Sequence, residues 1–342
     1  MKTEIICSSI LLLLLLSFGS CGNSSTDNNT EETAMNAPTG QPDIDGLTKE
    51  IVEDPYNAEL YARRGVLFYN KQGYDEAIRD LQHAIQLDST KAAYYHDLAD
   101  VNLDYFRSRQ ALAIMEDAAT RFPENIPTLL KLSEYQLILK QYEESMRTID
   151  QILKIDPQNA EAYFMFGMNF EEQGDTVRAI NSYQKAVEFD SKIIDGWINL
   201  GQLYSAIGDP LAERYLDNAV RIDPRNVYAL HAKAEYLADQ DNLQGAIDTY
   251  RDLITVDQQY ESAYFNSGLI YMDMDSIARA EEEFSRLLQV SPTEVRAYYY
   301  RGLAREMQGN IPAAIADYEQ ALKMVPNYER ARQALQRVKE AG

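Results

Sequence analysis

Basic residues, histidines and cysteines are all scarce in this chain of 342 residues. It carries 54 acidic side chains against 32 basic ones, which gives a net charge of −22 at neutral pH. Binding to a nucleic-acid backbone needs Lys and Arg clustered on one face, and the sequence contains no such cluster. We therefore expect no nucleic-acid partner and no direct electrostatic attraction to anionic lipid.

Recognisable catalytic and metal-binding patterns are also missing. The histidines His83, His96 and His231 lie far apart and have no metal-ligand spacing. Neither a His-Glu-x-x-His pattern, nor a Gly-x-Ser-x-Gly pattern, nor a glycine-rich phosphate loop occurs. The stretch from Asp239 to Asn242 lacks the ligand pattern of a calcium loop. We expect neither enzymatic activity, nor a cofactor, nor a metal site.

Only one long apolar run is present, from Ile5 to Phe18. It is shorter than the roughly 20 apolar residues that a membrane-spanning helix needs. Lys2 precedes the run and the small residues Gly19 and Ser20 follow it, which is typical of an export signal. We therefore predict that residues 1–20 are a signal peptide and that the protein is exported.

The residues at the predicted cleavage point, Phe18-Gly19-Ser20-Cys21, resemble a bacterial lipobox, with Phe18 in place of the usual Leu. The resemblance implies that Cys21 becomes the first residue of the mature protein and is acylated, which anchors the protein to a membrane. An ordinary secretory signal, the alternative, would leave Cys21 unmodified. Gly22 rather than Asp follows the cysteine, which in two-membrane bacteria implies transfer to the outer membrane, facing the periplasm.

The segment from residue 21 to residue 42 contains almost no large apolar side chain. A segment of this composition cannot offset the entropy that it would lose on ordering, so we predict a flexible tether. A coil of about 22 residues has a typical reach of roughly 25 Å. Such a tether would hold a folded body clear of the lipid headgroups.

A short phrase recurs through the rest of the chain. GYDEAIRDLQHAIQLD starts at Gly73, and similar phrases start at Gly174 and Gly309. Aligning the copies gives a period of about 34 residues. The eight copies begin at Ala58, Ala92, Ile126, Ala160, Ile194, Val227, Glu261 and Val295.

Three positions within the copies have a constant character. The fourth position is large in every copy, and the twentieth is Ala or Ser. The eighth position is always small: Gly65, Ala99, Ser133, Gly167, Gly201, Ala234, Gly268 and Gly302. Apolar residues recur at three- and four-residue spacing in both halves of each copy, which indicates two amphipathic helices. We predict that the small residues let the two helix backbones approach closely and that the large fourth residue fills the remaining space.

These recurring residues resemble the tetratricopeptide repeat, and the resemblance covers Ala58 to Tyr328. It implies an all-α fold, a right-handed α-solenoid of about eight helix-turn-helix units between capping helices. The predicted units are residues 58–91, 92–125, 126–159, 160–193, 194–226, 227–260, 261–294 and 295–328, and the predicted capping helices are residues 43–57 and 329–342. The fifth unit is one residue short between Gly201 and Ala212, so we expect a local change of pitch there.

In this family the first helix of each unit lines the concave face, mainly through positions two, five, nine and twelve. The resemblance therefore implies a partner-binding groove, which would be formed by Phe164, Met168, Ile198, Gln202, His231, Glu235, Phe265, Leu269, Met272, Tyr299 and Leu303. Apolar side chains with interspersed acids suit an extended or helical partner segment that is apolar and somewhat basic. The other interpretation is that aromatic residues at positions five and twelve pack partly between the repeat units.

The predicted function is that of a membrane-anchored, non-catalytic scaffold that binds a peptide or helix of another protein in cell-envelope assembly. The sequence leaves two alternatives open. One is a structural protein that associates with further copies of itself. The other is an accessory subunit of a cell-wall enzyme complex whose catalyst is a separate chain.

Overall fold

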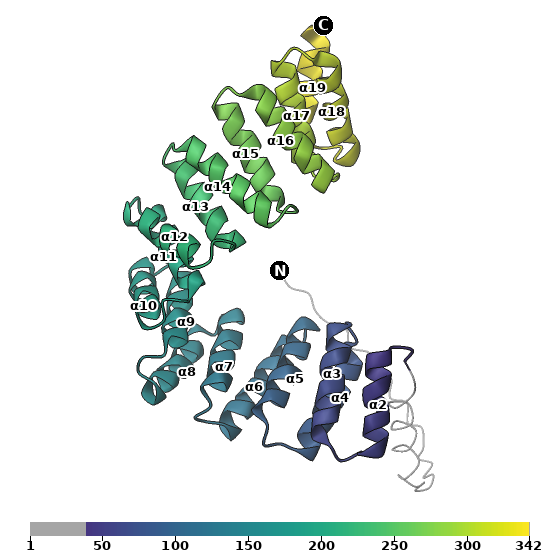
Figure 1. Cartoon of the computed structure of the whole chain (residues 1–342), viewed down its shortest axis with the longest axis vertical. Helices are drawn as coiled ribbons and strands as arrows, with labels where there is room; N and C mark the ends of the chain where they lie inside the picture. Colours follow the sequence, from purple (N-terminus) through teal and green to yellow (C-terminus); the bar gives the residue numbers. More distant parts are fainter. Residues whose placement is uncertain (1–38, 342) are drawn as a thin grey trace, which may run out of the picture. The chain divides into compact units, whose positions relative to one another are not determined.

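The computed structural model describes residues 39–341, and every regular element in that range is an α-helix (Figure 1). The all-α class predicted from the sequence is confirmed. The predicted signal peptide, the acylated Cys21 and most of the predicted tether lie outside the described residues. Nothing in the structure therefore bears on these three predictions.

The helices from α3 to α18 form hairpins of a first and a second helix, called repeats 1 to 8 below. The first helices are α3 (Ala58–Asn70), α5 (Ala92–Asp104), α7 (Ile126–Ile138), α9 (Ala160–Glu172), α11 (Ile194–Ala206), α13 (Val227–Asp239), α15 (Glu261–Asp273) and α17 (Val295–Met307). The second helices are α4 (Tyr74–Leu87), α6 (Ser108–Arg121), α8 (Tyr142–Ile155), α10 (Thr176–Phe189), α12 (Leu211–Ile222), α14 (Leu243–Val256), α16 (Ile277–Val290) and α18 (Ile311–Met324). A lone helix lies at each end, α2 (Pro42–Glu53) before repeat 1 and α19 (Glu329–Ala341) after repeat 8.

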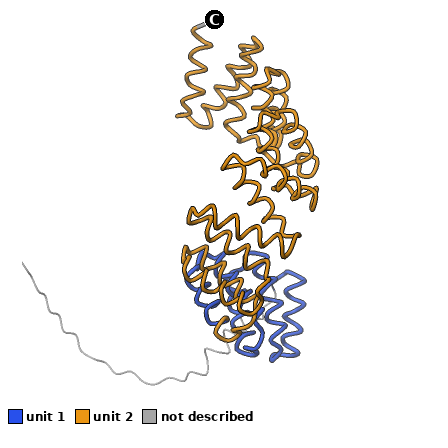
Figure 2. The backbone as a smooth tube through the Cα atoms, turned by 90° about the vertical axis from the view of Figure 1, so that its left-hand side faces the viewer, with its two compact units in different colours: residues 1–118 blue, residues 119–342 orange. Residues whose placement is uncertain are grey.

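The chain divides into two compact bodies, residues 1–118 and 119–342 (Figure 2). We call them the N-terminal body and the C-terminal body. Within each body, a helix packs mainly against its neighbours in sequence, as α9 does against α8 and α10. Each body is therefore built by local stacking, which is characteristic of repeat proteins.

Every repeat turns from its first to its second helix through a left-handed residue at position fifteen. The eight residues, all with φ between 54° and 78°, are Gln72, Phe106, Lys140, Gly174, Gly208, Asp241, Asp275 and Gly309. In repeat 4, Asp175 N–H donates to Phe170 O at 2.8 Å and Gly174 N–H donates to Glu171 O at 2.9 Å. This is the Schellman arrangement, in which a left-handed residue closes a helix. Only three repeats use glycine, so packing of the two helices imposes the turn on the other five.

The small residue at position eight makes room for one particular side chain. A Cβ atom built on Gly167 would lie 2.4 Å from the ring of Tyr183, and one built on Gly268 would lie 2.6 Å from the ring of Phe284. Both rings come from position twenty-four of the second helix of the same repeat and are fully buried. The sequence predicts that these small residues allow the two helix backbones to approach closely. The structure shows that an inserted side chain from position twenty-four is the main reason.

The first lone helix has different limits from those predicted. The tether was expected to run to residue 42 and the capping helix to fill residues 43–57, but α2 begins at Pro42 and ends at Glu53. Proline is favoured at the first helical position because its φ is already helical. Asp45 also accepts hydrogen bonds from the backbone N–H groups of Thr39 and Gly40, at 2.7 and 3.1 Å. These contacts order residues just before the helix.

The first and last repeats each contain an ion pair between positions seven and twenty-three, which is buried in repeat 1 and partly buried in repeat 8. Arg64 Nε lies 2.6 Å from Asp80 Oδ2, and both side chains are almost fully buried. Arg64 Nη1 also donates to Thr48 Oγ1 of α2 at 3.1 Å. In repeat 8, Arg301 Nη2 lies 2.6 Å from Asp317 Oδ1. A buried guanidinium therefore ties α2 to the hairpin of repeat 1.

Candidate functional site

All of the predicted groove residues lie on first helices of the C-terminal body. They belong to α9, α11, α13, α15 and α17. Some first helices of this body touch directly, as α7 touches α9 and α11 touches α13. The predicted residues therefore share the side of the stack that the first helices form, which we call the first-helix face.

The aromatic residues at position five pack inside their own repeats. Phe164 lies against Tyr183 with 5.4 Å between ring centroids, and His231 lies against Tyr250 at 5.9 Å. Phe265 against Phe284 and Tyr299 against Tyr318 repeat the contact, each at 6.0 Å. In each pair the second ring is the buried one at position twenty-four. These four predicted residues are thus half-buried supports of the core as well as parts of the face.

Phe265 is covered further by residues that the sequence analysis did not single out. The ring of Tyr300 meets it edge-on at 5.5 Å, and the guanidinium of Arg296 lies 4.6 Å from its centroid. Arg296 is held there by Glu294, whose carboxylate lies 2.9 Å from its Nε. The signal that could have located Tyr300 is its position, next to Tyr299 in a run of three tyrosines.

The aliphatic members of the predicted groove differ in how much they offer to a partner. Met168, Leu269 and Met272 are half-buried and pack against core clusters of the C-terminal body. Leu303 is half-buried. Ile198 is only 5% exposed and packs in the core beside Leu216. Its side chain is not available to a partner, because repeats 5 and 6 enclose it.

Gln202 and Glu235 are the exposed polar members of the set. Glu235 Oε1 lies 3.1 Å from His231 Nε2, one helical turn away on α13. This hydrogen bond from His231 lowers the pKa of the Glu235 carboxyl against a smaller opposing effect of burial. Glu235 is therefore a negative charge at neutral pH on the first-helix face.

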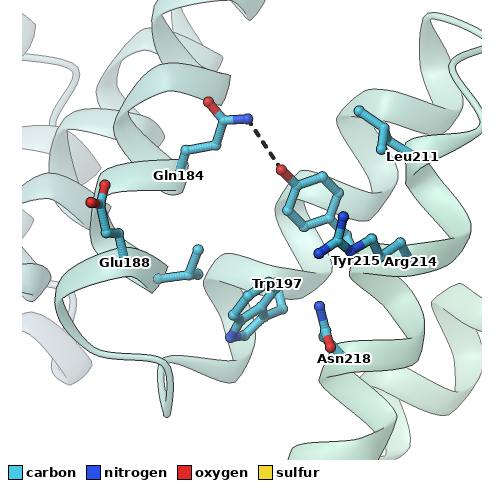
Figure 3. Close-up of a pocket in the computed structure, with 8 residues that line it drawn as sticks. Gln184, Glu188, Trp197, Leu211, Arg214, Tyr215 and Asn218 are labelled. Atoms are coloured by element: carbon cyan, nitrogen blue, oxygen red, sulfur yellow. Dashed lines mark hydrogen bonds between the residues drawn. The ribbon is translucent and has the colours of Figure 1, made fainter.

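A pocket that the sequence analysis missed lies on the other side of the C-terminal body, between second helices (Figure 3). It has a volume of about 420 Å³ and is bounded by α10, α11 and α12. Trp197 and Tyr215 line it, together with the charged residues Glu188 and Arg214. Two features of the sequence point to this place, the only tryptophan of the chain and the shortened turn of the fifth repeat.

Residues 39–341 contain neither an evident metal site nor a membrane-spanning helix. Across residues 39–341, no group of three or more His, Cys, Asp or Glu side chains is placed to hold a metal ion. Within that range no helix combines the length and the apolar character that crossing a membrane requires.

Comparison with protein families gives matches along most of the chain. Three family models, each described as tetratricopeptide repeat, match the chain in several segments. The segments are residues 58–91 and 160–193 for one model, 102–165 for the second, and 199–262 and 265–329 for the third.

Two curated relatives share about a quarter of their residues with this chain over the matched part. Human protein O-mannosyl-transferase TMTC1 is 24% identical over 209 residues, which are 60% of this chain and 23% of that protein. The Bos taurus BBSome complex member BBS4 is 23% identical over 208 residues, 60% of this chain and 40% of that protein. The chain thus spans less than half the length of these relatives, and the transferase activity named for the first belongs to a much longer protein.

Two solved structures resemble the fold. The C-terminal part of a TPR repeat-containing protein from Cytophaga hutchinsonii has a TM-score of 0.58 at 15% identity, covering 72% of this chain and 99% of that one. A chain of the APC/C hetero-tetramer Cut9-Hcn1 has a TM-score of 0.51 at 16% identity, covering 92% and 60%. At these identities the likeness concerns the fold alone, and it supports the predicted α-solenoid.

Proposed function

Because this chain belongs to the tetratricopeptide repeat family, whose repeats mediate protein–protein interactions, we propose that it is a non-catalytic scaffold that binds another protein. The binding surface is the first-helix face of the C-terminal body. The occupant is an extended or helical segment of the partner. Tetratricopeptide scaffolds are generally non-catalytic, which agrees with the absence of recognisable catalytic patterns in the sequence.

The observation that carries this proposal is the row of half-buried apolar side chains on the first helices. Four of these side chains are only partly buried and keep part of their surface in contact with solvent: Met168, Leu269, Met272 and Leu303. Partly exposed apolar area on a stacked helical face is typical of a contact surface. Methionine and leucine adapt to partners of irregular shape.

The charges on this face favour a partner that is somewhat basic. Glu235 is a carboxylate with 51% of its side chain exposed. The cations Arg296, Arg301 and Arg305 of α17 are already paired with Glu294, Asp317 and Glu281 of the chain itself. Lys and Arg side chains of a partner would therefore meet an exposed carboxylate, that of Glu235. Such charge complementarity raises the association rate and selects against acidic segments.

Membrane attachment and envelope location are parts of the same proposal. They rest on the resemblance of residues 18–21 to a lipobox and on the polar segment that follows. Acylated Cys21 would anchor the protein to the outer membrane on its periplasmic side, and the tether would give the scaffold its reach. Radioactive or clickable palmitate supplied to growing cells should label the protein, and Cys21→Ser should remove the label. An unlabelled wild-type protein would overturn the anchor.

The binding surface is tested by crosslinking in the native cells, with variants that keep the core intact. Leu303→Glu changes a half-buried side chain of the first-helix face, and Glu235→Lys changes an exposed one. Val177→Glu is the matched control, since Val177 is 71% exposed on the second helix α10. We expect one crosslinked protein to be lost in both face variants and retained in the control. Retention of every crosslink in the face variants would exclude this face.

A further inference from the structure

The pocket between α10 and α12 has a composition that a packing role does not explain. Trp197 and Tyr215 form its aromatic floor, Val187 and Leu211 add apolar lining, and its rim carries Glu188, Arg214 and Asn218. A volume of about 420 Å³ lies in the range of small-molecule sites. Figure 3 shows Glu188 and Arg214 on opposite sides of the pocket, on different helices.

The aromatic floor of the pocket, formed by Trp197 and Tyr215, is held rigidly. Trp197 and Tyr215 lie 5.9 Å apart with 37° between their planes, and Tyr215 stacks on Tyr204 at 5.1 Å. Gln184 Nε2 donates to the hydroxyl oxygen of Tyr215 at 3.1 Å (Figure 3). It also lies 2.9 Å from the hydroxyl oxygen of Tyr204, to which it donates. Trp197 Nε1 donates to Ser191 O at 2.9 Å. The two rings are therefore fixed before any ligand arrives, which lowers the entropic cost of binding.

The charged groups of the rim have no partner within the described chain. Glu188 and Arg214 take part in no ion pair or side-chain hydrogen bond among residues 39–341, and both are exposed. Asn218 accepts from Arg221 through Oδ1 and keeps its amide N–H groups for another acceptor. The rim thus offers an acceptor-only group, a donor-only group and an amide around one aromatic floor.

A second pocket lies at the corresponding place in the N-terminal body, between the second helices of repeats 1 and 2. The pocket between α4 and α6 is lined at the equivalent positions by Gln86 for Glu188, Tyr95 for Trp197, and Ala113 and Ile114 for Arg214 and Tyr215. It has a single aromatic ring and no cation. The architecture therefore produces such a hollow without this chemistry, and the aromatic pair with two opposite charges distinguishes the pocket of repeats 4 and 5 from it.

From these contacts we propose that the pocket binds a neutral pyranose, as a free sugar or as a unit of a glycan. One face of a pyranose ring carries C–H groups, and these pack on the aromatic floor. Its hydroxyl groups both donate and accept, so they satisfy Glu188, Arg214 and Asn218 together. A site built to hydrogen-bond hydroxyl groups rejects analogues that lack them, because its polar groups are then left unpaired.

Other ligand classes fit this arrangement less well. A small anion that pairs with Arg214 meets the carboxylate of Glu188, and a small cation that pairs with Glu188 meets the guanidinium of Arg214. An apolar helix of a partner protein would cover both charges without supplying hydrogen bonds, which is unfavourable. A neutral polyol can use every group of the rim, because each of its hydroxyl groups both donates and accepts.

The test uses Trp197 as its own reporter, because it is the only tryptophan in the chain. The full-length protein is titrated with the methyl glycosides of glucose, galactose and N-acetylglucosamine, and with their β-linked disaccharides. Tryptophan emission and the indole N–H resonance are recorded. We expect a saturable change with at least one sugar, and tighter binding of a disaccharide if the natural ligand is a glycan.

Matched variants assign the binding to the rim. Arg214→Gln and Glu188→Gln should each weaken binding about tenfold, as expected for the loss of a hydrogen bond to a charged group. Arg225→Gln and Glu213→Gln make the same charge changes nearby outside the pocket and should leave binding unchanged. Trp197→Leu, followed by calorimetry, should abolish binding without unfolding, because repeats 3 and 6 carry Leu129 and Leu230 at that position.

Two results would overturn the proposal. One is the absence of a saturable change with all of these sugars. The other is binding that persists equally in Arg214→Gln and Glu188→Gln. The partner-binding face is on the first helices, so failure here leaves the proposed scaffold function untouched.

Discussion

Single residues determine how each repeat turns and packs. The turn between the two helices has a conformational cost, which Phe106 shows most clearly. It has a left-handed φ of 58° in the turn of repeat 2, and its side chain is 95% exposed. The left-handed region costs a residue other than glycine roughly 1–2 kcal/mol. Repeats 4, 5 and 8 avoid this cost with Gly174, Gly208 and Gly309 at the same position.

Replacing Phe106 by glycine should therefore stabilise the protein. We expect Phe106→Gly to raise the free energy of unfolding by about 0.5–1 kcal/mol, since the ring makes little contact that would be lost. Denaturant unfolding followed by circular dichroism measures the change. Phe106→Ala is the control, because it removes the ring but keeps a Cβ atom; an equal gain in both variants would show that backbone strain is not the cause.

The contact between positions eight and twenty-four supplies a second prediction at this scale. Gly167→Ala should destabilise the protein by about 1–3 kcal/mol, because the new methyl group overlaps the fully buried ring of Tyr183. Adding Tyr183→Met should restore part of the loss, since repeat 2 pairs Ala99 with Met115 at these positions. Thermal unfolding of the single and double variants gives the answer. No recovery in the double variant would contradict the proposed cause.

At the scale of helices, buried and partly buried charges fix how the ends are attached. Asp80 joins α4 to α3 through Arg64 and, by way of Thr48, to α2. Removing one partner of a buried pair leaves an uncompensated charge, whereas an apolar pair of similar volume is often as stable. Repeat 2 already has such a pair, Leu98 and Ile114, at the same two positions.

Asp80→Ile alone should thus cost about 3–5 kcal/mol, because Arg64 keeps its charge without a carboxylate. The double variant Arg64→Leu with Asp80→Ile should lie within about 1.5 kcal/mol of the wild type. Unfolding in urea separates the two outcomes. If both variants are destabilised equally, the ion pair itself contributes the stability.

The attachment of α19 should depend on pH. A hydrogen bond from Arg337 lowers the pKa of the Glu306 carboxyl from its usual 4.5. Burial raises this pKa by a smaller amount, and a hydrogen bond from Tyr318 lowers it further. A lowered folded-state pKa adds stability above the unfolded pKa, and this stability is lost as the pH falls through the folded pKa.

Glu306→Gln should therefore reduce stability by a constant amount between neutral pH and about pH 5, and by a shrinking amount below it. Melting temperatures across this range test the expectation. Glu319→Gln, which removes the exposed pair with Lys339, should have little effect at any pH. A difference for Glu306→Gln that grows as the pH falls would contradict the sign of the pKa change.

Helix pairs were predictable from the sequence because they depend on periodicity and on small residues at fixed positions. The groove was less predictable. A residue on a first helix can face both its own second helix and the solvent. Residue spacing alone does not determine what fraction of its side chain is buried. Phe164 and Tyr299 therefore proved to be partly core, and Ile198 fully so. The pocket beside Trp197 depends on contacts between two repeats, which no single repeat encodes.

For the molecule as a whole, stability should be a local property. In the C-terminal body α9 and α10 pack chiefly against α7, α8 and α11. In such stacks each repeat is stabilised by its own contacts and by those with the adjacent repeats. Gly167→Ala should therefore speed amide hydrogen exchange from α7 to α11 and leave α17 and α18 unchanged. Exchange measured by mass spectrometry tests this. Faster exchange throughout the body would mean that it unfolds as one cooperative unit.

The insertion of a ring at position twenty-four beside a glycine at position eight also bears on how such a chain evolves. The two residues, such as Gly167 and Tyr183, always belong to the same repeat. Duplication or exchange of whole repeats keeps each matched pair together. Recombination with a crossover inside a repeat would join a glycine-type first helix to a second helix that lacks the matching ring. Viable recombinants should therefore have their crossovers between repeats.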